Sequence, residues 1–495
     1  MLKLGFDNEK YIALQSQKIK ERIKYFGGKL YLEFGGKLFD DFHASRVLPG
    51  FSPDSKVKML LKLKDQAEIV IVINSSAIES NKKRGDLGIG YDQDVLRLID
   101  AFRTIGLYVG SVVITCFSEH SSVLLFEKRL KNLGIKVYRH YTIENYPSDI
   151  PHIVSKEGFG KNDYVKTSRS FVVVTAPGPG SGKMAVCLSQ MFHDHLKGIK
   201  SGYAKFETFP IWNLPLKHSV NLAYEAATAD LSDVNMIDPF HLEAYGETTV
   251  NYNRDIEIFP VLNSMMQKIL GESPYKSPTD MGVNMAGYAI FDDDVVCQAA
   301  NQEIVRRYCK TKVLAKLGVA EQNEVLNQEL IMQKAGVSLS DRKVIDAALK
   351  KSEKTGGPAV AIELNTGEII TGKTSSLLGA CASALLNALK TLAEIDDSVN
   401  LISPAVIEPV QKLKIGYMGN HNPRLHTDEI LIALSICAAT DSIAAKALEQ
   451  LPKLAGCELH STVILAASDE HVLRKLGFNV TSEPIHETKK LYHPR

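Results

Sequence analysis

Hydrophobic residues in the first third of the chain form short runs that alternate with amphipathic segments. Four β-branched or apolar runs predict strands at residues 30–34, 68–73, 109–115 and 135–138. Apolar residues with helical spacing predict helices at 94–102 and 123–133. The strands are apolar almost throughout, which is typical of parallel strands that are covered on both faces. We therefore predict an α/β fold, built mainly from parallel sheets covered by helices.

A fifth apolar run, Phe171–Thr175, leads into a loop of glycine and proline and then into a helix that begins at Lys183. Such a loop brings backbone N–H groups together, and the helix dipole and the lysine add positive charge. This is the layout of a phosphate-binding loop. The residues that we expect to hold a phosphate are Gly178, Gly180, Ser181, Gly182 and Lys183. The alternative interpretation is a plain strand-to-helix turn that needs small residues.

The loop matches the phosphate-loop pattern G-x-x-x-x-G-K-[S/T] only in part. Gly182 and Lys183 are in place, but Pro177 stands where the first glycine belongs. Met184 stands where a hydroxyl normally binds Mg²⁺. A thioether is a poor ligand for a hard cation. The sequence therefore favours a nucleotide such as ATP, or another phosphorylated ligand. It argues against Mg²⁺ at this loop, and it identifies no residue that would bind a metal ion.

A second segment, Gly367–Thr374, satisfies the same pattern letter for letter. Its context is different, because residues 359–364 read as a strand and Asn365–Gly367 as a hairpin turn. Residues 368–371 then read as the returning strand, which cannot easily form a compact cradle of N–H groups. We therefore favour the first loop over the second.

The strand expected after the loop helix, at residues 202–209, places Lys205 and Glu207 on one face. The two side chains could simply pair, or they could line a site, and we name them as candidate catalytic residues. The order of strand, glycine loop with lysine, helix and strand, over residues 171–209, resembles dethiobiotin-synthetase-like P-loop enzymes.

Polar loops follow the predicted strands. The densest lies at residues 35–46, and shorter ones lie at 74–76 and 83–86. Ligands of parallel sheets lie beyond the carboxyl ends of the strands, so we predict a substrate loop at 35–46, with ordinary loop chemistry as the alternative. Residues 212–287 are polar and show no clear periodicity, and we expect a long irregular region with a functional role. At residues 292–294, three aspartates either end a strand as metal ligands or begin a helix, and we favour the helix.

The last third of the chain reads as a separate α/β domain. We divide the chain into residues 1–335, comprising 1–165 and 166–335, and the C-terminal domain 340–495. Helices at 376–389 and 430–439 are apolar on nearly every face, so we expect a homo-oligomer with its interface in this domain. Between these helices, His421 and Arg424, with His426 nearby, are candidate catalytic residues. The alternative is a polar loop that ends at a helix cap, for which we predict Thr427.

Composition excludes several classes of protein. The chain has 495 residues, of which 23% are charged, and its net charge of +1 gives no general attraction to nucleic acid or to an anionic membrane. We find no apolar run long enough to span a membrane and no core of a signal peptide. The seven cysteines are scattered without a C-x-x-C pair, which favours reduced thiols in the cytoplasm. We expect no zinc site.

The whole chain resembles a family of uncharacterised bacterial proteins that is known only as a domain of unknown function. The resemblance is carried by the segments 32–41, 176–183, 203–212 and 426–429. It implies a soluble bacterial cytoplasmic protein and transfers no catalytic residues. Our leading hypothesis is an enzyme of phosphoryl transfer or ATP-dependent ligation on a small metabolite, bound at residues 177–183. The alternative is a non-catalytic protein that binds a phosphorylated metabolite.

Overall fold

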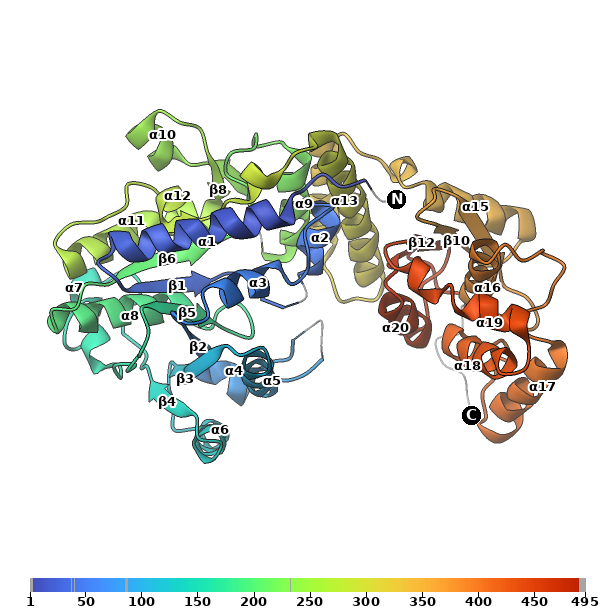
Figure 1. Cartoon of the computed structure of the whole chain (residues 1–495), viewed down its shortest axis with the longest axis horizontal. Coiled ribbons are helices and arrows are strands. Elements are labelled where there is room, and N and C mark those ends of the chain that lie inside the picture. The colour runs from blue at the N-terminus through green and yellow to red at the C-terminus, as the bar shows by residue number, and fades with distance from the viewer. Residues whose placement is uncertain (1–2, 37, 40, 85–87, 232, 489–495) are drawn as a thin grey trace. The chain divides into compact units, whose positions relative to one another are not determined.

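A seven-stranded parallel sheet forms the centre of the N-terminal part of the molecule, as a computed structural model shows (Figure 1). The structure describes residues 3–36, 38–39, 41–84, 88–231 and 233–488. It divides into two compact units. We call Leu4–Tyr224 with Ser232–Cys297 the N-terminal unit, and Gln298–Arg495 with Glu225–Leu231 the C-terminal unit. The N-terminal sheet confirms the predicted α/β class.

Six of the seven strands of the sheet lie at apolar runs that the sequence predicted as strands, whereas the short strand β9 was not predicted. Their order across the sheet is β4-β3-β2-β5-β1-β6-β9, and all their pairings are parallel. Their bounds are β1 Leu30–Phe34, β2 Ala67–Asn74, β3 Tyr108–Thr115, β4 Lys136–Arg139, β5 Phe171–Thr175, β6 Gly202–Phe206 and β9 Gly282–Val283. The α-helices that precede β1 or connect the strands from β1 to β6 are α1 Asn8–Tyr25, α2 Phe42–Val47, α3 Ser55–Lys62, α4 Ser75–Glu79, α5 Tyr91–Thr104, α6 Ser121–Asn132, α7 Ile150–Ile153 and α8 Lys183–Leu196.

The strand order creates a switch point between β1 and β5. These two strands are hydrogen-bonded neighbours. The chain leaves β1 through α2 and α3 and crosses β5 to reach β2, whereas it leaves β5 through α8 and crosses β1 to reach β6. Because both crossovers are expected to be right-handed, the two connections lie on opposite faces of the sheet. The loops after β1 and β5 therefore diverge at the position where open α/β sheets usually bind ligands.

Side-chain contacts confirm this division of the faces. Glu33 and Lys205 occupy registered positions of β1 and β6, so they point to the same face. Helix α8 covers that face, since its first residue, Lys183, lies beside Glu33. The next residue along β6, Phe206, points to the other face, where the ammonium of Lys56 from α3 lies 5.8 Å from the centroid of its ring.

The segment 212–287, for which we expected a long irregular region, is mostly regular structure, so that prediction was wrong. It contains α9 Ser219–Ala227, β7 Asn235–Ile237, α10 Pro239–Tyr245, β8 Val250–Tyr252, α11 Asn253–Leu270 and α12 Pro278–Met281. Strands β7 and β8 form a small antiparallel sheet. Ile256, Phe259, Leu262 and Ile269 of α11 are buried at helical spacing. The polar residues around them, and Pro260 inside the helix, had obscured that period.

The C-terminal unit holds a four-stranded mixed sheet in the order β11-β10-β12-β13. The pairs β10–β11 and β10–β12 are antiparallel, and β12–β13 is parallel. The strands are β10 Ala359–Glu363, β11 Ile369–Lys373, β12 Glu458–Ser461 and β13 Asn479–Ser482. The α-helices are α14 Gln322–Ala335, α15 Lys343–Thr355, α16 Ala380–Leu392, α17 Pro404–Lys412, α18 Thr427–Ala438, α19 Ser442–Leu448 and α20 Ala467–Lys475, with α13 Asp293–Lys316 beginning in the other unit.

The two apolar helices of this unit differ in their surroundings. On α16, eight of the thirteen residues are buried in the core of the unit, which accounts for its lack of a polar face. On α18, Ile432 and Ile436 are each 64% exposed. The residue that caps α18 is His426, one position before the predicted Thr427. The three aspartates at 292–294 lie at the start of α13, as we favoured.

Candidate functional site

The loop between β5 and α8 has a backbone that requires glycine. Gly180 and Gly182 have φ angles of +74° and +85°, which L side chains rarely adopt. A Cβ at Gly178 would overlap the hydroxyl of Tyr91. Gly182 is the N-cap of α8 and provides no side-chain cap. The first-turn N–H groups of the helix, which have no intrahelical acceptor, are therefore left open at this end.

Residues at the ends of β2 and β3 hold the carbonyl groups of this loop. The Thr115 hydroxyl donates a hydrogen bond of 2.8 Å to the carbonyl oxygen of Ser181. Asn74 donates a longer one, of 3.4 Å, to the carbonyl oxygen of Gly180. The N–H groups of Gly180, Ser181 and Gly182 donate no hydrogen bond within the described part of the chain. The loop therefore directs its acceptors to the protein and leaves its donors available.

The hydroxyl of Ser181 and the side chain of Met184 are both occupied by contacts within the protein. The Ser181 hydroxyl donates to the carbonyl oxygen of Gly178 at 2.8 Å, and the residue is only 2% exposed. Met184 lines a narrow apolar hollow together with Ile258, Leu262 and other residues. Packing against α11 is thus a physical reason for a thioether at this position.

Lys183 begins α8 and lies close to a carboxylate of the sheet. Its ammonium nitrogen is 3.9 Å from Oε1 of Glu33, and the two side chains are 15% and 14% exposed. The hydroxyl of Tyr203 donates to the other carboxylate oxygen of Glu33 at 2.8 Å. Glu33 was not among the site residues predicted from the sequence, although a single carboxylate in the apolar strand Leu30–Phe34 was a signal that could have revealed it.

Lys205 and Glu207 form an ion pair, as one of our two interpretations held. The Lys205 ammonium lies 3.0 Å from Oε1 of Glu207, and it also binds Asp255 of α11. Burial alone would lower the pKa of Lys205, but Asp255 and Glu207 outweigh burial and raise it above its usual range. Burial raises the pKa of Glu207 to about 7, against the opposing effect of Lys205. A carboxyl group of this kind can exchange a proton near neutral pH.

These residues form one charged group on the α8 side of the sheet. Lys183 and Lys205 flank Glu33, because β1 lies between β5 and β6. Asp255 adds a second carboxylate beside Lys205, from a position that nothing in the sequence indicated. The structure therefore brings the predicted residues Lys205 and Glu207 to the same side of the sheet as Lys183 of the predicted loop.

The predicted substrate loop at 35–46 contains a buried ion pair on the opposite side of the sheet. The Lys56 ammonium lies 2.7 Å from Oδ2 of Asp41, which also caps α2. Burial would raise the pKa of Asp41, but Lys56 outweighs burial and lowers it. Lys37 and Asp40 of this loop, and Gly85 and Asp86 of the loop at 83–86, lie outside the described residues.

His421 and Arg424 belong to the C-terminal unit and not to the unit that carries the loop 177–183. His421 is exposed, and Arg424 pairs with Glu487 at 3.0 Å. The neighbouring His426 donates a hydrogen bond of 2.8 Å from Nδ1 to Oδ2 of Asp469, and this partner raises the pKa of His426. This loop thus ends at a helix cap, in agreement with the alternative that we stated.

The second motif is a hairpin and not a loop. Its residues 369–373 form β11 and pair in register with β10, with Gly367 at the turn in a left-handed conformation, φ +86°. The backbone of Ala384 packs against Gly372 so closely that a Cβ at this glycine would overlap it. The glycine that completes the pattern is therefore required by the packing of α16 on the sheet.

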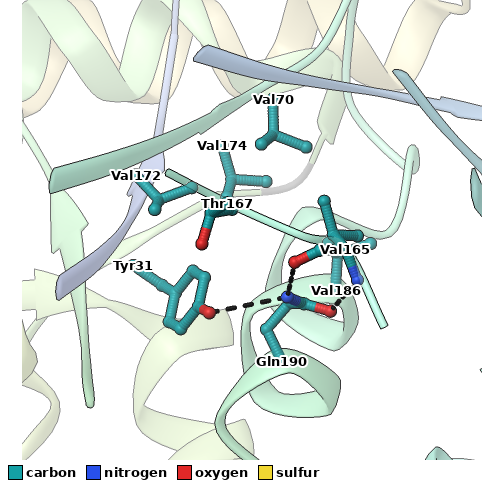
Figure 2. Close-up of a pocket in the computed structure, with 8 residues that line it drawn as sticks. All are labelled: Tyr31, Val70, Val165, Thr167, Val172, Val174, Val186 and Gln190. Atoms are coloured by element: carbon teal, nitrogen blue, oxygen red, sulfur yellow. Dashed lines mark hydrogen bonds between the residues drawn. The ribbon is translucent and has the colours of Figure 1, made fainter. Parts of the chain in front are cut away.

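Figure 2 shows the residues that line a narrow internal gap between the sheet and α8. This gap has no room for a water molecule. Gln190 of α8 closes one side, and its amide exchanges two hydrogen bonds of 2.9 Å with the backbone of Val165 (Figure 2). The remaining lining residues are Tyr31, Val70, Thr167, Val172, Val174 and Val186. We interpret this gap as a feature of core packing. In the described part of the chain, no helix is long and apolar enough to cross a membrane.

Known proteins match this chain over nearly its whole length. Residues 4–336 match the family described as domain of unknown function DUF1846, N-terminal, and residues 340–492 match its C-terminal counterpart. A UPF0371 protein of Streptococcus thermophilus (strain CNRZ 1066) is 60% identical over 492 residues, covering 99% of this chain and 100% of that protein. A UPF0371 protein of Streptococcus pneumoniae (strain JJA) is 59% identical, with the same coverage of both chains.

Proposed function

We propose that this chain, which belongs to the DUF1846 family, binds a nucleotide or another phosphorylated small molecule at the loop 177–183. The observation that carries the proposal is the open end of α8. Gly182 caps this helix without a side chain, and the loop N–H groups before it donate no hydrogen bond within the described residues. Backbone N–H groups and a helix dipole favour an anion at such a position.

The position in the fold supports the same conclusion. The loop follows β5 at the switch point, next to the carboxyl end of β1. Lys183 adds a full positive charge to the site. Its partner Glu33 is 3.9 Å away, longer than a close ion pair, so a bound phosphate can replace this carboxylate as the partner of the lysine.

For catalysis we propose phosphoryl transfer or ATP-dependent ligation on a small metabolite. Lys183 and the loop N–H groups would stabilise the charge that develops on the phosphate. Glu207, with a pKa raised by burial to about 7, would accept a proton from the acceptor substrate, and Lys205 would hold it in place. The seven free cysteines support our expectation that the protein works in the cytoplasm.

The alternative function, a non-catalytic protein that binds a phosphorylated metabolite, is favoured by one observation. Met184 packs against α11, and the hydroxyl of Ser181 already donates within the loop. The usual route for holding Mg²⁺ between the phosphates is therefore missing at this loop. A ligand that binds would then be tested for chemical conversion by the protein. Conversion would support the enzyme, and binding without conversion would support the non-catalytic protein.

The test compares the lysines of the two motifs. We expect Lys183→Ala to remove ligand-induced thermal stabilisation, because it deletes the only side-chain cation of the first motif while the apo fold remains. Lys373→Ala is the matched control, because Lys373 is exposed on a hairpin strand. At a ligand concentration 100 times Kd, the unmodified protein should gain about 2.7 kcal/mol.

The screen would use nucleotides and sugar phosphates, each with and without Mg²⁺. If Lys373→Ala removed the stabilisation and Lys183→Ala did not, the letter-perfect motif would be the true site. If neither change had an effect on a ligand that binds, the loop 177–183 would not be the phosphate site.

A further inference from the structure

Three side chains that can bind a metal ion meet at the N-terminal ends of α9 and α13. His218 immediately precedes α9, Asp293 is the first residue of α13, and Cys297 follows it one turn later on the same face. All three belong to the N-terminal unit. One ligand atom from each lies within 4.8 Å of the other two. The group is far along the chain from the loop 177–183 and plays no part in the function proposed above.

The distances within this group are close to those between the ligands of a tetrahedral coordination shell, with the two oxygens of Asp293 facing one partner each. Nε2 of His218 lies 3.0 Å from Oδ1 of Asp293 and 3.4 Å from Sγ of Cys297. Sγ of Cys297 lies 3.8 Å from Oδ2 of Asp293. Zinc bonds of about 2.0–2.3 Å at tetrahedral angles separate their ligand atoms by roughly 3.3–3.6 Å. Small side-chain movements would therefore suffice to surround an ion.

The same three residue types could instead form a nucleophilic triad, but the geometry argues against it. In a triad, one ring nitrogen faces the nucleophile and the other faces the carboxylate. Here Nε2 of His218 faces both groups, while Nδ1 accepts a hydrogen bond of 3.2 Å from the N–H of Val220. Burial, with Asp293 as a further cause, raises the pKa of the Cys297 thiol, which is the opposite of activation.

Helix capping explains only part of the arrangement. The hydrogen bond from Val220 makes His218 a side-chain cap of α9. This accounts for the ring position, and it leaves a proton on Nε2 that can be donated to Asp293. It does not account for the thiol of Cys297, which lies against the same nitrogen. Metal binding through Nε2 would require the proton on Nδ1, so the bond from Val220 would be lost. One capping bond would be exchanged for three metal–ligand bonds.

We infer that His218, Asp293 and Cys297 form a binding site for Zn²⁺ or a transition-metal cation of similar softness. Imidazole and thiolate ligands select such ions over Mg²⁺ and Ca²⁺. Coordination converts the Cys297 thiol to a thiolate and releases its proton to solvent. Three protein ligands leave a fourth tetrahedral position for water. Asp293 is 63% exposed, which gives the ion a route from solvent.

The test is a titration of the full-length protein with Co²⁺ after treatment with a chelator. We expect one equivalent to bind with the near-ultraviolet charge-transfer band of a cobalt–thiolate bond, and Zn²⁺ to abolish that band by displacing the cobalt. Cys297→Ser should abolish the band. Cys116→Ser, which changes an exposed cysteine elsewhere, should keep it.

The other two ligands are tested by affinity. We expect His218→Ala and Asp293→Asn each to weaken Zn²⁺ binding by at least about tenfold. Asp294→Asn is the matched control for charge and should weaken the binding much less than Asp293→Asn does. Circular dichroism of each variant separates lost ligands from lost fold. Binding without the thiolate band, equal affinity in Cys297→Ser, or no stoichiometric binding by the unmodified protein would overturn the inference.

Discussion

Removing the ammonium group of Lys205 should destabilise the N-terminal unit in a way that depends on pH. In the unmodified protein, this group lies between the carboxylates of Glu207 and Asp255. Lys205→Met keeps the length of the side chain but leaves the two acidic groups without their cation. Breaking a buried ion pair by removing one partner costs about 3–5 kcal/mol.

The exposure of the pair sets the expected size of the effect. The side chains of Lys205 and Asp255 are 22% and 20% exposed, so solvent screens part of their interaction. We therefore expect the lower end of that range, about 3 kcal/mol, at pH 8. At pH 6 the loss should be smaller, because Glu207, whose pKa burial raises to about 7, takes up a proton and removes one of the two charges.

The single tryptophan of the chain provides the assay. Trp212 donates a hydrogen bond of 3.3 Å to Oε2 of Glu207, so its fluorescence follows the unfolding of this site in urea. Lys20→Met, at an exposed position of α1, is the matched control and should change stability by less than about 0.5 kcal/mol. A loss below 1 kcal/mol for Lys205→Met at pH 8, or a loss that grows as the pH falls, would refute the reasoning.

Three further predictions concern protonation, magnesium and assembly. The folded-state pKa of Glu207 is raised to about 7 from an ordinary value of 4.5, so the stability that this group contributes is present below pH 4.5 and is lost as the pH rises through 7. Glu207→Gln should therefore remove this pH dependence of stability, which is measured as the urea midpoint at several pH values between 4.5 and 8. For Met184→Thr, we expect a cost of about 1–2 kcal/mol from lost packing and no gain of Mg²⁺-dependent nucleotide binding, so tight Mg²⁺–ATP binding by the unmodified protein would contradict us. We also predict a homo-oligomer through the C-terminal unit, where Ile432 and Ile436 of α18 are exposed, and sedimentation of a clean monomer at micromolar concentration would exclude it.

Sequence patterns predicted the local structure well where one period dominates. The strands at 30–34 and 171–175, the helix that begins at Lys183 and the hairpin at Gly367 all lie where the sequence placed them. The prediction failed for the segment 212–287, where several patterns overlap. In α11 the apolar period was present, but an internal proline and polar neighbours concealed it.

The sequence by itself determined the phosphate-loop candidate, because a glycine loop between a buried strand and a helix is a local pattern. Only the tertiary structure decided what surrounds this loop. The strand order puts β1 beside β5, which brings Glu33 to Lys183, and the packing of α11 brings Asp255 to Lys205. The tertiary structure likewise brings His218 to Asp293, 75 positions further along the chain. Backbone periodicity fixes which side chains share a face within one element, but contacts between elements depend on the order in which the strands pair and the helices pack.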